Sequence, residues 1–172
     1  NLESGTLLLS REAVEVPVLF DGVSRMYAHT AAQKGVKIVV ELPESVPYVD
    51  ADAEQADLLM QKLVENAVEF CPPNSRVEMR GTLVRDGSAL VISVVDEGPG
   101  IDREHREVIF ESFRQIESGH TRSHPGVGLG LAIARQIARA HQTDVAVESE
   151  PGSGSTFSVE FPVASASLGE NS

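Results

Sequence analysis

The spacing of apolar residues along the chain predicts three helices, each with one apolar face. Over residues 17–34 and again over 52–70, apolar side chains recur three and four positions apart, as they do along one face of a helix. The second stretch is followed by Pro72 and Pro73, which cannot continue a helix. A third stretch with the same period covers residues 129–141. We therefore expect three helices that each bury one side against another layer.

Shorter apolar runs, some rich in β-branched residues, predict strands between and after the helices. They span residues 36–42, 46–50, 76–85, 89–96, 144–150 and 155–161. Asp86 and Gly87 form a favoured two-residue hairpin turn, so the two runs beside them are expected to pair antiparallel. Helices and strands do not alternate regularly, which argues against a doubly wound parallel sheet. The pattern indicates an α+β domain with one mostly antiparallel sheet covered on one face by helices.

The composition fits one globular domain and argues against some classes of binding partner. The 172 residues are 41% hydrophobic and 23% charged, close to the average for folded proteins, so the chain is not a disordered acidic segment. Its 14 Lys and Arg against 26 Asp and Glu give a net charge of −12 with neutral histidines. Non-specific binding to nucleic acids or to anionic membranes needs a cationic surface, and the overall charge argues against both.

Cysteine content and hydropathy indicate the compartment. Cys71 is the single cysteine, so an internal disulfide is excluded, and no Cys or His lies near it at metal-ligand spacing. No apolar run reaches the about 18 to 20 residues that a membrane span requires, and the first residues lack the pattern of a signal peptide. We expect a cytoplasmic domain, and the sequence leaves open whether its parent protein is anchored in a membrane.

The segment from Asp96 to Gly100 ends an apolar strand with an acid followed by a Gly-Pro-Gly sequence. On its own, such a segment is most often a turn. However, the strand before Asp96 is strongly apolar, so its carboxylate is expected at the end of the sheet, partly sheltered from water. A sheltered carboxylate needs a hydrogen-bond donor, and the exocyclic amine of adenine is one candidate. The glycines would let a ligand approach the backbone closely.

A second glycine cluster, Gly126-Val127-Gly128-Leu129-Gly130, opens the third helix. Free backbone N–H groups and the positive end of the helix dipole favour phosphate at such a position. The spacing matches neither the dinucleotide-binding nor the Walker fingerprint, and tight packing alone explains these glycines equally well. Basic and polar residues just upstream favour a polyphosphate ligand. These residues are Arg114, His120, Thr121, Arg122 and His124.

Three polar residues share one face of the second helix: Lys62, Asn66 and Glu69, spaced by four and three positions. The side-chain oxygen of Asn66 could bind a hard cation such as Mg²⁺, which prefers oxygen ligands. For an isolated Asn, a solvated polar stripe is the commoner explanation.

The order and spacing of these motifs together resemble the catalytic, ATP-binding domain of bacterial sensor histidine kinases, part of the ATPase group that includes gyrase, Hsp90 and MutL. The resemblance runs over residues 1–163. The matching segments are the asparagine box at 63–67, the first glycine box at 96–101, the phenylalanine box at 110–113, the lid at 114–122, the second glycine box at 126–133 and the closing segment at 148–157. Several boxes in one order are far more specific than any one alone.

The resemblance implies a Bergerat-type fold: a two-layer sandwich with a mixed, mostly antiparallel sheet of about five strands covered on one face by about three helices. It implies ATP and Mg²⁺ as cofactors, with Asp96 on the adenine amine and Asn66 on the metal. The other implied nucleotide-binding residues are Gly98, Gly100, Ile101, Phe113, Gly126, Val127, Gly128, Leu129, Gly130 and Thr156. Lys62, Gln115 and Arg122, with Asn66, are the residues expected to serve phosphoryl transfer, for which positioning and charge neutralisation are the main requirements.

Two positions depart from the family pattern. Lys62 stands where these kinases usually carry Asn, and Glu69 stands where Lys or Arg is frequent. Glu69 beside a triphosphate would weaken binding by repulsion unless it faces solvent or pairs with a cation. We expect Lys62 to take over part of the neutralisation of the phosphates. Gyrase-like members use a Glu general base at the position of Lys62, so hydrolysis of that type is disfavoured. His141-Gln142-Thr143 replaces the usual His-Gly-Gly, which suggests a different turn.

The phosphate acceptor is expected outside this chain. None of the five histidines lies in the His-Glu/Asp-x-x-x-Pro setting from which these kinases accept phosphate, and we expect a structural role for His141. The resemblance therefore implies a histidine on a separate dimerisation domain upstream, whose end matches residues 1–10. The catalytic domain would cover 11–163 and a disordered tail 164–172.

The expected partners are that upstream domain and, through the whole protein, a response regulator, but no nucleic acid. We expect the domain alone to be monomeric. Two alternatives remain: a degenerate nucleotide-sensing or scaffold module, suggested by Lys62 and Glu69, and a serine kinase of the anti-sigma-factor type.

Overall fold

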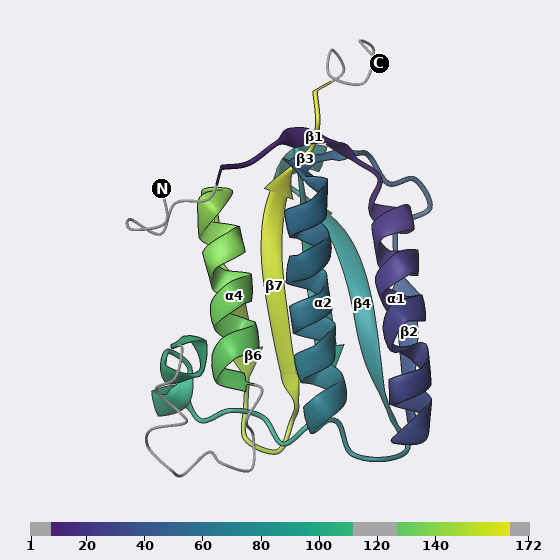
Figure 1. Ribbon diagram of the computed structural model, residues 1–172, viewed down its shortest axis with the longest axis vertical. Coiled ribbons are helices and arrows are strands. Elements are labelled where there is room, and N and C mark those ends of the chain that lie inside the picture. Colours follow the sequence, from purple (N-terminus) through teal and green to yellow (C-terminus); the bar gives the residue numbers. More distant parts are fainter. Residues whose placement is uncertain (1–7, 112–126, 166–172) are drawn as a thin grey trace.

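The computed structural model describes residues 8–111 and 127–165, and for 127–129 it describes the backbone alone. These residues form two layers, with the helices packed on one face of a sheet (Figure 1). The helices are α1 (Val16–Gln33), α2 (Ala53–Phe70) and α4 (Val127–Ala140). The strands are β1 (Arg11–Val14), β2 (Val36–Glu41), β3 (Val49–Asp52), β4 (Ser75–Val84), β5 (Ala89–Asp96), β6 (Ala146–Ser149) and β7 (Ser155–Pro162).

The main sheet has five strands in the order β2-β4-β5-β7-β6. The β2–β4 pair is parallel and the other three pairs are antiparallel. β1 and β3 form a separate antiparallel pair that crosses one end of the helices (Figure 1). The prediction of an α+β sandwich with a mostly antiparallel five-stranded sheet is confirmed.

Local sequence explains where the helices begin and end. Pro17 lies in the first turn of α1, and Gly35, at φ 76°, follows its end. Asp52 caps α2 by accepting a hydrogen bond from the backbone N–H of Gln55 at 3.0 Å. The three predicted helices are confirmed, and α4 begins two residues earlier than expected.

The core lies between the helices and the sheet. Leu59 and Leu63 of α2 and Phe157 and Phe161 of β7 are at most 1% exposed. Burial of such side chains provides the main driving force for folding. Met26 is 53% exposed, although Val23 and Ala31 of the same helix are buried, so Met26 lies outside the buried face of α1.

Other predictions need correction. The turn between β4 and β5 is a four-residue loop, because Val84 pairs with Ala89 and Arg85, Asp86 and Gly87 all have positive φ. The short strand expected at 46–50 corresponds to β3, which begins three residues later, and its partner β1 was not predicted.

After β5 the described chain forms two short 3₁₀ turns, η3 (Arg103–His105) and η4 (Val108–Phe110). None of the helices in the described ranges is long and apolar enough to cross a membrane.

Candidate functional site

Asp96 ends β5 on the buried side of the sheet and is 5% exposed. Its Oδ1 accepts the backbone N–H of Gly98 at 2.8 Å, and the backbone N–H of Ser155 also donates to the carboxylate. Burial raises the pKa of this carboxyl above its ordinary value, although the two N–H donors act in the opposite direction. A carboxylate can accept about four hydrogen bonds, so Asp96 keeps acceptor capacity for a ligand.

The glycines after Asp96 allow backbone segments to pack without space for a side chain. A Cβ on Gly98 would lie 2.9 Å from the carbonyl oxygen of Phe70, at the end of α2, and 3.0 Å from Asp96 Oδ1. A Cβ on Gly100, whose φ is 82°, would overlap the carbonyl oxygen of Glu150. The segment 96–101 is therefore held between the end of α2 and the β6–β7 loop.

Ser149 links this segment to the β6–β7 loop. Its Oγ accepts the N–H of Ile101 at 2.7 Å and lies 2.9 Å from the carbonyl oxygen of Gly154, to which it donates. The hydroxyl of Ser155 is 3.0 Å away. Since Ser149 and Ser155 are both buried, these bonds fix the loop relative to Ile101.

Asn66 lies on α2, one turn after Lys62 and on the same face of the helix. Its Oδ1 is buried and has no hydrogen-bond partner among the described residues. A buried carbonyl oxygen without a donor is costly for the fold unless a ligand binds it. An amide oxygen is also a normal ligand of Mg²⁺, so the donor set fits such an ion.

Lys62 lies one turn before Asn66 and points its side chain towards the start of α4. Its Cδ is 3.9 Å from the position of a Cβ on Gly130, and its Nζ is 3.5 Å from Glu65 Oε1. The side chain is 26% exposed. Lys62 therefore brings a positive charge to the first turn of α4, and within the described ranges its ion pair is a long one with an exposed partner.

The second glycine box forms that first turn. Val127, Gly128, Leu129 and Gly130 are helical, so the dipole of the 14-residue helix α4 gives this end a positive potential. Lys62 and the helix terminus reinforce each other in attracting an anion.

The end of α2 is capped by a lysine from α1. Lys34 Nζ lies 2.8 Å from the carbonyl oxygen of Val68 and 2.6 Å from that of Glu69. This contact satisfies carbonyls that a helix end leaves free, at the end of α2 that packs against Gly98. The Glu69 side chain itself is exposed, and the ion pair of Lys62 is with Glu65.

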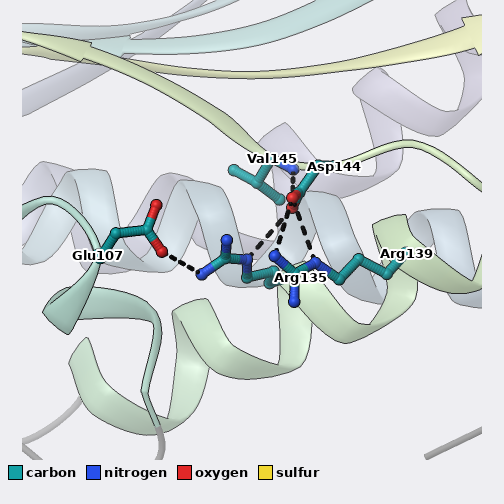
Figure 2. Close-up of polar contacts among 5 residues, drawn as sticks. All are labelled: Glu107, Arg135, Arg139, Asp144 and Val145. Atoms are coloured by element: carbon teal, nitrogen blue, oxygen red, sulfur yellow. Dashed lines mark hydrogen bonds and ion pairs between the residues drawn. The ribbon is translucent and has the colours of Figure 1, made fainter.

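Arg135 of α4 holds the turn η4 in place (Figure 2). Its guanidinium lies 3.0 Å from Glu107 and 3.3 Å from Asp144, and 4.8 Å from the centre of the Phe110 ring. Arg139 shares Asp144 at 3.1 Å. Phe110 in turn packs edge-on against Phe157 of the core. The chain between the two glycine boxes is thereby tied to α4 up to Phe110.

The structure brings together many, but not all, of the sequence-predicted residues. Asp96, Gly98, Gly100 and Ile101 form one cluster. Lys62, Asn66 and Gly130 form a second on the facing sides of α2 and α4. Phe113, Gln115, Arg122 and Gly126 lie outside the described residues.

The predicted role of Thr156 in nucleotide binding stays a prediction. Thr156 and its neighbour Ser155 occupy different places in the sheet. Ser155 pairs with Asp96 across the sheet, whereas Thr156 pairs with Val95. Successive residues of a strand point to opposite faces, so Ser155 shares the buried face with Asp96. Sequence reasoning missed Ser149, Ser155 and Arg135. The alternation of Phe157, Val159 and Phe161 with polar residues was the available sequence signal for Ser155, which lies two residues before Phe157.

Comparison with known proteins gives a consistent result. The sequence profile described as histidine kinase-, DNA gyrase B- and HSP90-like ATPase matches residues 51–165. The non-motile and phage-resistance protein of Caulobacter vibrioides is 29% identical over 94% of this chain and 19% of its own length. The adaptive-response sensory kinase SasA of Crocosphaera subtropica is 31% identical over 91% of this chain and 40% of its own length. The chain thus spans less than half of these relatives.

Solved structures agree. Full-length ShkA in complex with AMPPNP superposes with a TM-score of 0.80 at 30% identity, over 95% of this chain and 34% of ShkA. The catalytic domain of histidine kinase ThkA superposes with a TM-score of 0.75 over 90% of this chain and 99% of its own, and at 23% identity it supports the fold alone. With the profile covering most of the domain, the chain belongs to the family of histidine kinase-, DNA gyrase B- and HSP90-like ATPases.

Proposed function

We propose that this chain is the ATP-binding catalytic domain of a two-component sensor histidine kinase. The observation that carries the proposal is the placement of two complementary groups in a member of this ATPase family. A buried carboxylate, Asp96, lies on one side, and on the other the buried oxygen of Asn66 has no partner among the described residues, one turn after Lys62 on α2.

The base would lie against the segment 96–101. Asp96 accepts a hydrogen bond from the exocyclic amine, and Gly98 and Gly100 keep the adjoining backbone free of side chains. Ile101 contributes apolar surface, and it is half-buried against the core. Adenine is selected over guanine, because guanine presents a carbonyl oxygen where adenine presents a donor, and two acceptors repel each other. Phe113 and Thr156 complete this side in the proposal.

The phosphates would lie between α2 and the start of α4. Backbone N–H groups of 126–130 donate to them, and Lys62 neutralises part of their charge. Gln115 and Arg122 are proposed to contact them from the segment between η4 and α4. Glu69 does not oppose this arrangement, since its side chain is exposed.

Asn66 would hold Mg²⁺ through Oδ1, and a bound Mg²⁺ would neutralise charge on the phosphate oxygens. In the transfer, a histidine nitrogen of a separate domain attacks the γ-phosphorus. The bond from that phosphorus to the β–γ bridging oxygen breaks, and ADP leaves with the electron pair. The residues of this chain position the nucleotide and balance its charge. A response regulator would receive the phosphoryl group from that histidine.

Titration of the chain with the non-hydrolysable analogue AMP-PNP, by calorimetry with and without Mg²⁺, tests the binding step. We expect saturable binding that Mg²⁺ strengthens. Absence of binding at millimolar analogue would leave the scaffold alternative and overturn the proposal.

The acceptor is tested on the whole parent protein. After incubation with γ-labelled ATP, we expect a protein label that is lost in acid and retained in alkali, as a phosphoramidate is. An acid-stable label would instead indicate a serine kinase.

A further inference from the structure

A buried polar cluster joins α2 and α4 at the ends that lie far from the candidate nucleotide site. It consists of Asp52 at the start of α2, His141 directly after α4, and the backbone of Ser10. Asp52 is 8% exposed and His141 is 4% exposed. In Figure 1, α4 ends beside the start of α2 at the edge crossed by β1, whereas α4 begins at the opposite edge.

The hydrogen bonds of His141 define its protonation state. Its Nε2 lies 3.1 Å from the backbone nitrogen of Asp52 and must accept that N–H. Its Nδ1 lies 2.9 Å from the carbonyl oxygen of Ile137, which can only accept, so Nδ1 carries the proton. The ring also packs edge-on against Phe161, with 5.3 Å between ring centres. His141 is therefore a neutral imidazole fixed on three sides.

The same Asp52 ties in two further segments. Its Oδ1 accepts the N–H of Gln55 at 3.0 Å and so caps α2, while its Oδ2 accepts the N–H of Ser10 at 2.8 Å. Burial alone would raise the pKa of Asp52, but the backbone N–H donors outweigh it and lower that pKa. The start of α2 is thereby held at one place relative to the end of α4.

The position of this buried polar cluster matters because helices are stiff. Lys62 lies ten residues and Asn66 fourteen residues after Asp52, which is about 15 to 21 Å at the rise of an α-helix. Gly130 lies eleven residues before His141, a similar distance along α4. If α4 shifted along α2 at the buried polar cluster, the distance between Lys62 and the first turn of α4 would therefore change.

We propose that His141 is a positioning residue for the phosphate side of the site. Its hydrogen bond to the Asp52 N–H sets the placement of α4 along α2, and thus the distance between Lys62 and the N–H groups of residues 127–130. This inference rests on the proposed function, since it assigns those groups to nucleotide phosphates. The base side is built by β5, the β6–β7 loop and the end of α2 but not by α4, so a displacement of α4 should not change it.

Three variants of this chain separate the two bonds of the ring. His141→Asn places a donor near the position of Nδ1 but cannot reach Asp52. His141→Gln reaches further and offers an acceptor near the position of Nε2. His141→Leu removes both bonds. Phe161→Leu is the matched control, because it removes a ring contact of His141 and leaves both hydrogen bonds in place.

The measurement is calorimetric titration with AMP and with AMP-PNP, both in Mg²⁺, alongside thermal unfolding. We expect His141→Asn and His141→Leu to weaken binding of AMP-PNP by about five- to twentyfold and binding of AMP by less than twofold. For AMP-PNP this loss corresponds to about 1 to 2 kcal/mol of binding free energy. His141→Gln should restore the affinity ratio of the two ligands to within about twofold of wild type. Phe161→Leu should lower the unfolding temperature and leave that ratio unchanged.

Several results would overturn the inference. An unchanged ratio in folded His141→Asn would do so, as would equal weakening of both ligands, which marks a purely structural role. Failure of His141→Gln to restore the ratio would contradict the assigned bond. If His141→Leu does not fold, the Asn and Gln variants decide. Wild-type protein that binds neither nucleotide overturns the proposed function itself, and the inference with it.

Discussion

The two sides of the candidate site are built on different principles. On the base side, Asp96 and Ser149 are buried and hydrogen-bonded to backbone groups, and Gly100 leaves no space for a side chain. On the phosphate side, the Asn66 oxygen has no partner among the described residues, and Lys62 is held by one long ion pair. Internal contacts fix the described part of the base side, whereas the described part of the phosphate side keeps polar groups for a ligand.

This difference also explains how an acidic chain can bind a polyanion. The net charge is −12, yet the phosphate side combines Lys62 with the positive end of α4. Electrostatic attraction acts over a Debye length of about 8 to 10 Å, so the local arrangement matters more than the total charge. Glu69 is exposed, and its contact with Lys34 is made by the backbone oxygen.

The largest expected effect comes from adding a methyl group at Gly100, where the base side packs against the β6–β7 loop. Gly100→Ala forces a Cβ into the carbonyl of Glu150 at a φ of 82°, so we expect a loss of about 3 kcal/mol or more in the free energy of unfolding. Denaturant unfolding measures it. Gly152→Ala is the matched control: its φ is 85° but no atom lies within 4 Å, so about 1 kcal/mol is expected. Equal losses would contradict the close packing assigned to Gly100.

The next effect concerns recognition of the base. Asp96→Asn removes a charged acceptor, and hydrogen bonds to charged groups contribute about 1.5 to 3 kcal/mol, so we expect a tenfold or greater loss in affinity for AMP and AMP-PNP alike. Calorimetry measures both. A raised pKa means that the buried charge is unfavourable for the fold, so the variant should unfold at no lower temperature than wild type. Weaker binding of AMP-PNP with unchanged affinity for AMP would contradict the assignment of Asp96 to the base side.

The same carboxyl predicts a pH dependence of nucleotide binding. Because the pKa of Asp96 is raised, its proton is taken up at a higher pH than by an ordinary aspartate as the solution is acidified. Protonation removes the charged acceptor, so nucleotide affinity should begin to fall at a pH above the usual aspartate range. Affinity measured between pH 4 and 7 should lose this acid limb in Asp96→Asn.

A smaller effect is expected on the phosphate side. Lys62→Ala removes one partly exposed positive charge, and we expect about three- to tenfold weaker AMP-PNP binding with AMP unchanged. Glu65→Gln is the control, because it releases Lys62 from its ion pair and should leave AMP-PNP affinity equal or higher. Unchanged AMP-PNP affinity in Lys62→Ala would show that α4 and other groups suffice.

The smallest effect is expected outside both sides. Glu107→Gln breaks one ion pair of Arg135, but the Glu107 side chain is 77% exposed, and such pairs contribute little. We expect unfolding temperature and AMP affinity to stay close to wild type. Arg135→Met should have the larger effect on unfolding, because it also removes the pair with Asp144 and the contact with Phe110. If Glu107→Gln had the larger effect, η4 would depend on that one exposed pair.

Features with a local signal could be predicted from the sequence. The bounds of α1, α2 and α4 follow from apolar spacing and from Pro and Gly at their ends, and Asp96 follows from its place after an apolar strand. The turn at 85–88 could not be predicted, because Arg85 and Asp86 both adopt positive φ that their residue types do not require.

Features that depend on distant contacts had no local signal. His141 meets Asp52 across 89 positions, and Arg135 meets Glu107 across 28. Their roles follow only from the packing of α4 against α2 and η4. Alternation along β7 places Ser155 and Thr156 on opposite faces, but only the register of β7 on β5 shows that Ser155 lies opposite Asp96.

The most direct test of the account is the affinity ratio of AMP-PNP to AMP, measured by calorimetry in Mg²⁺ for wild type, Asp96→Asn and Lys62→Ala. If the base and phosphate sides are separate, Asp96→Asn weakens both ligands by the same factor and keeps the wild-type ratio, whereas Lys62→Ala lowers it. A ratio that falls in Asp96→Asn and stays constant in Lys62→Ala would contradict the division of the site.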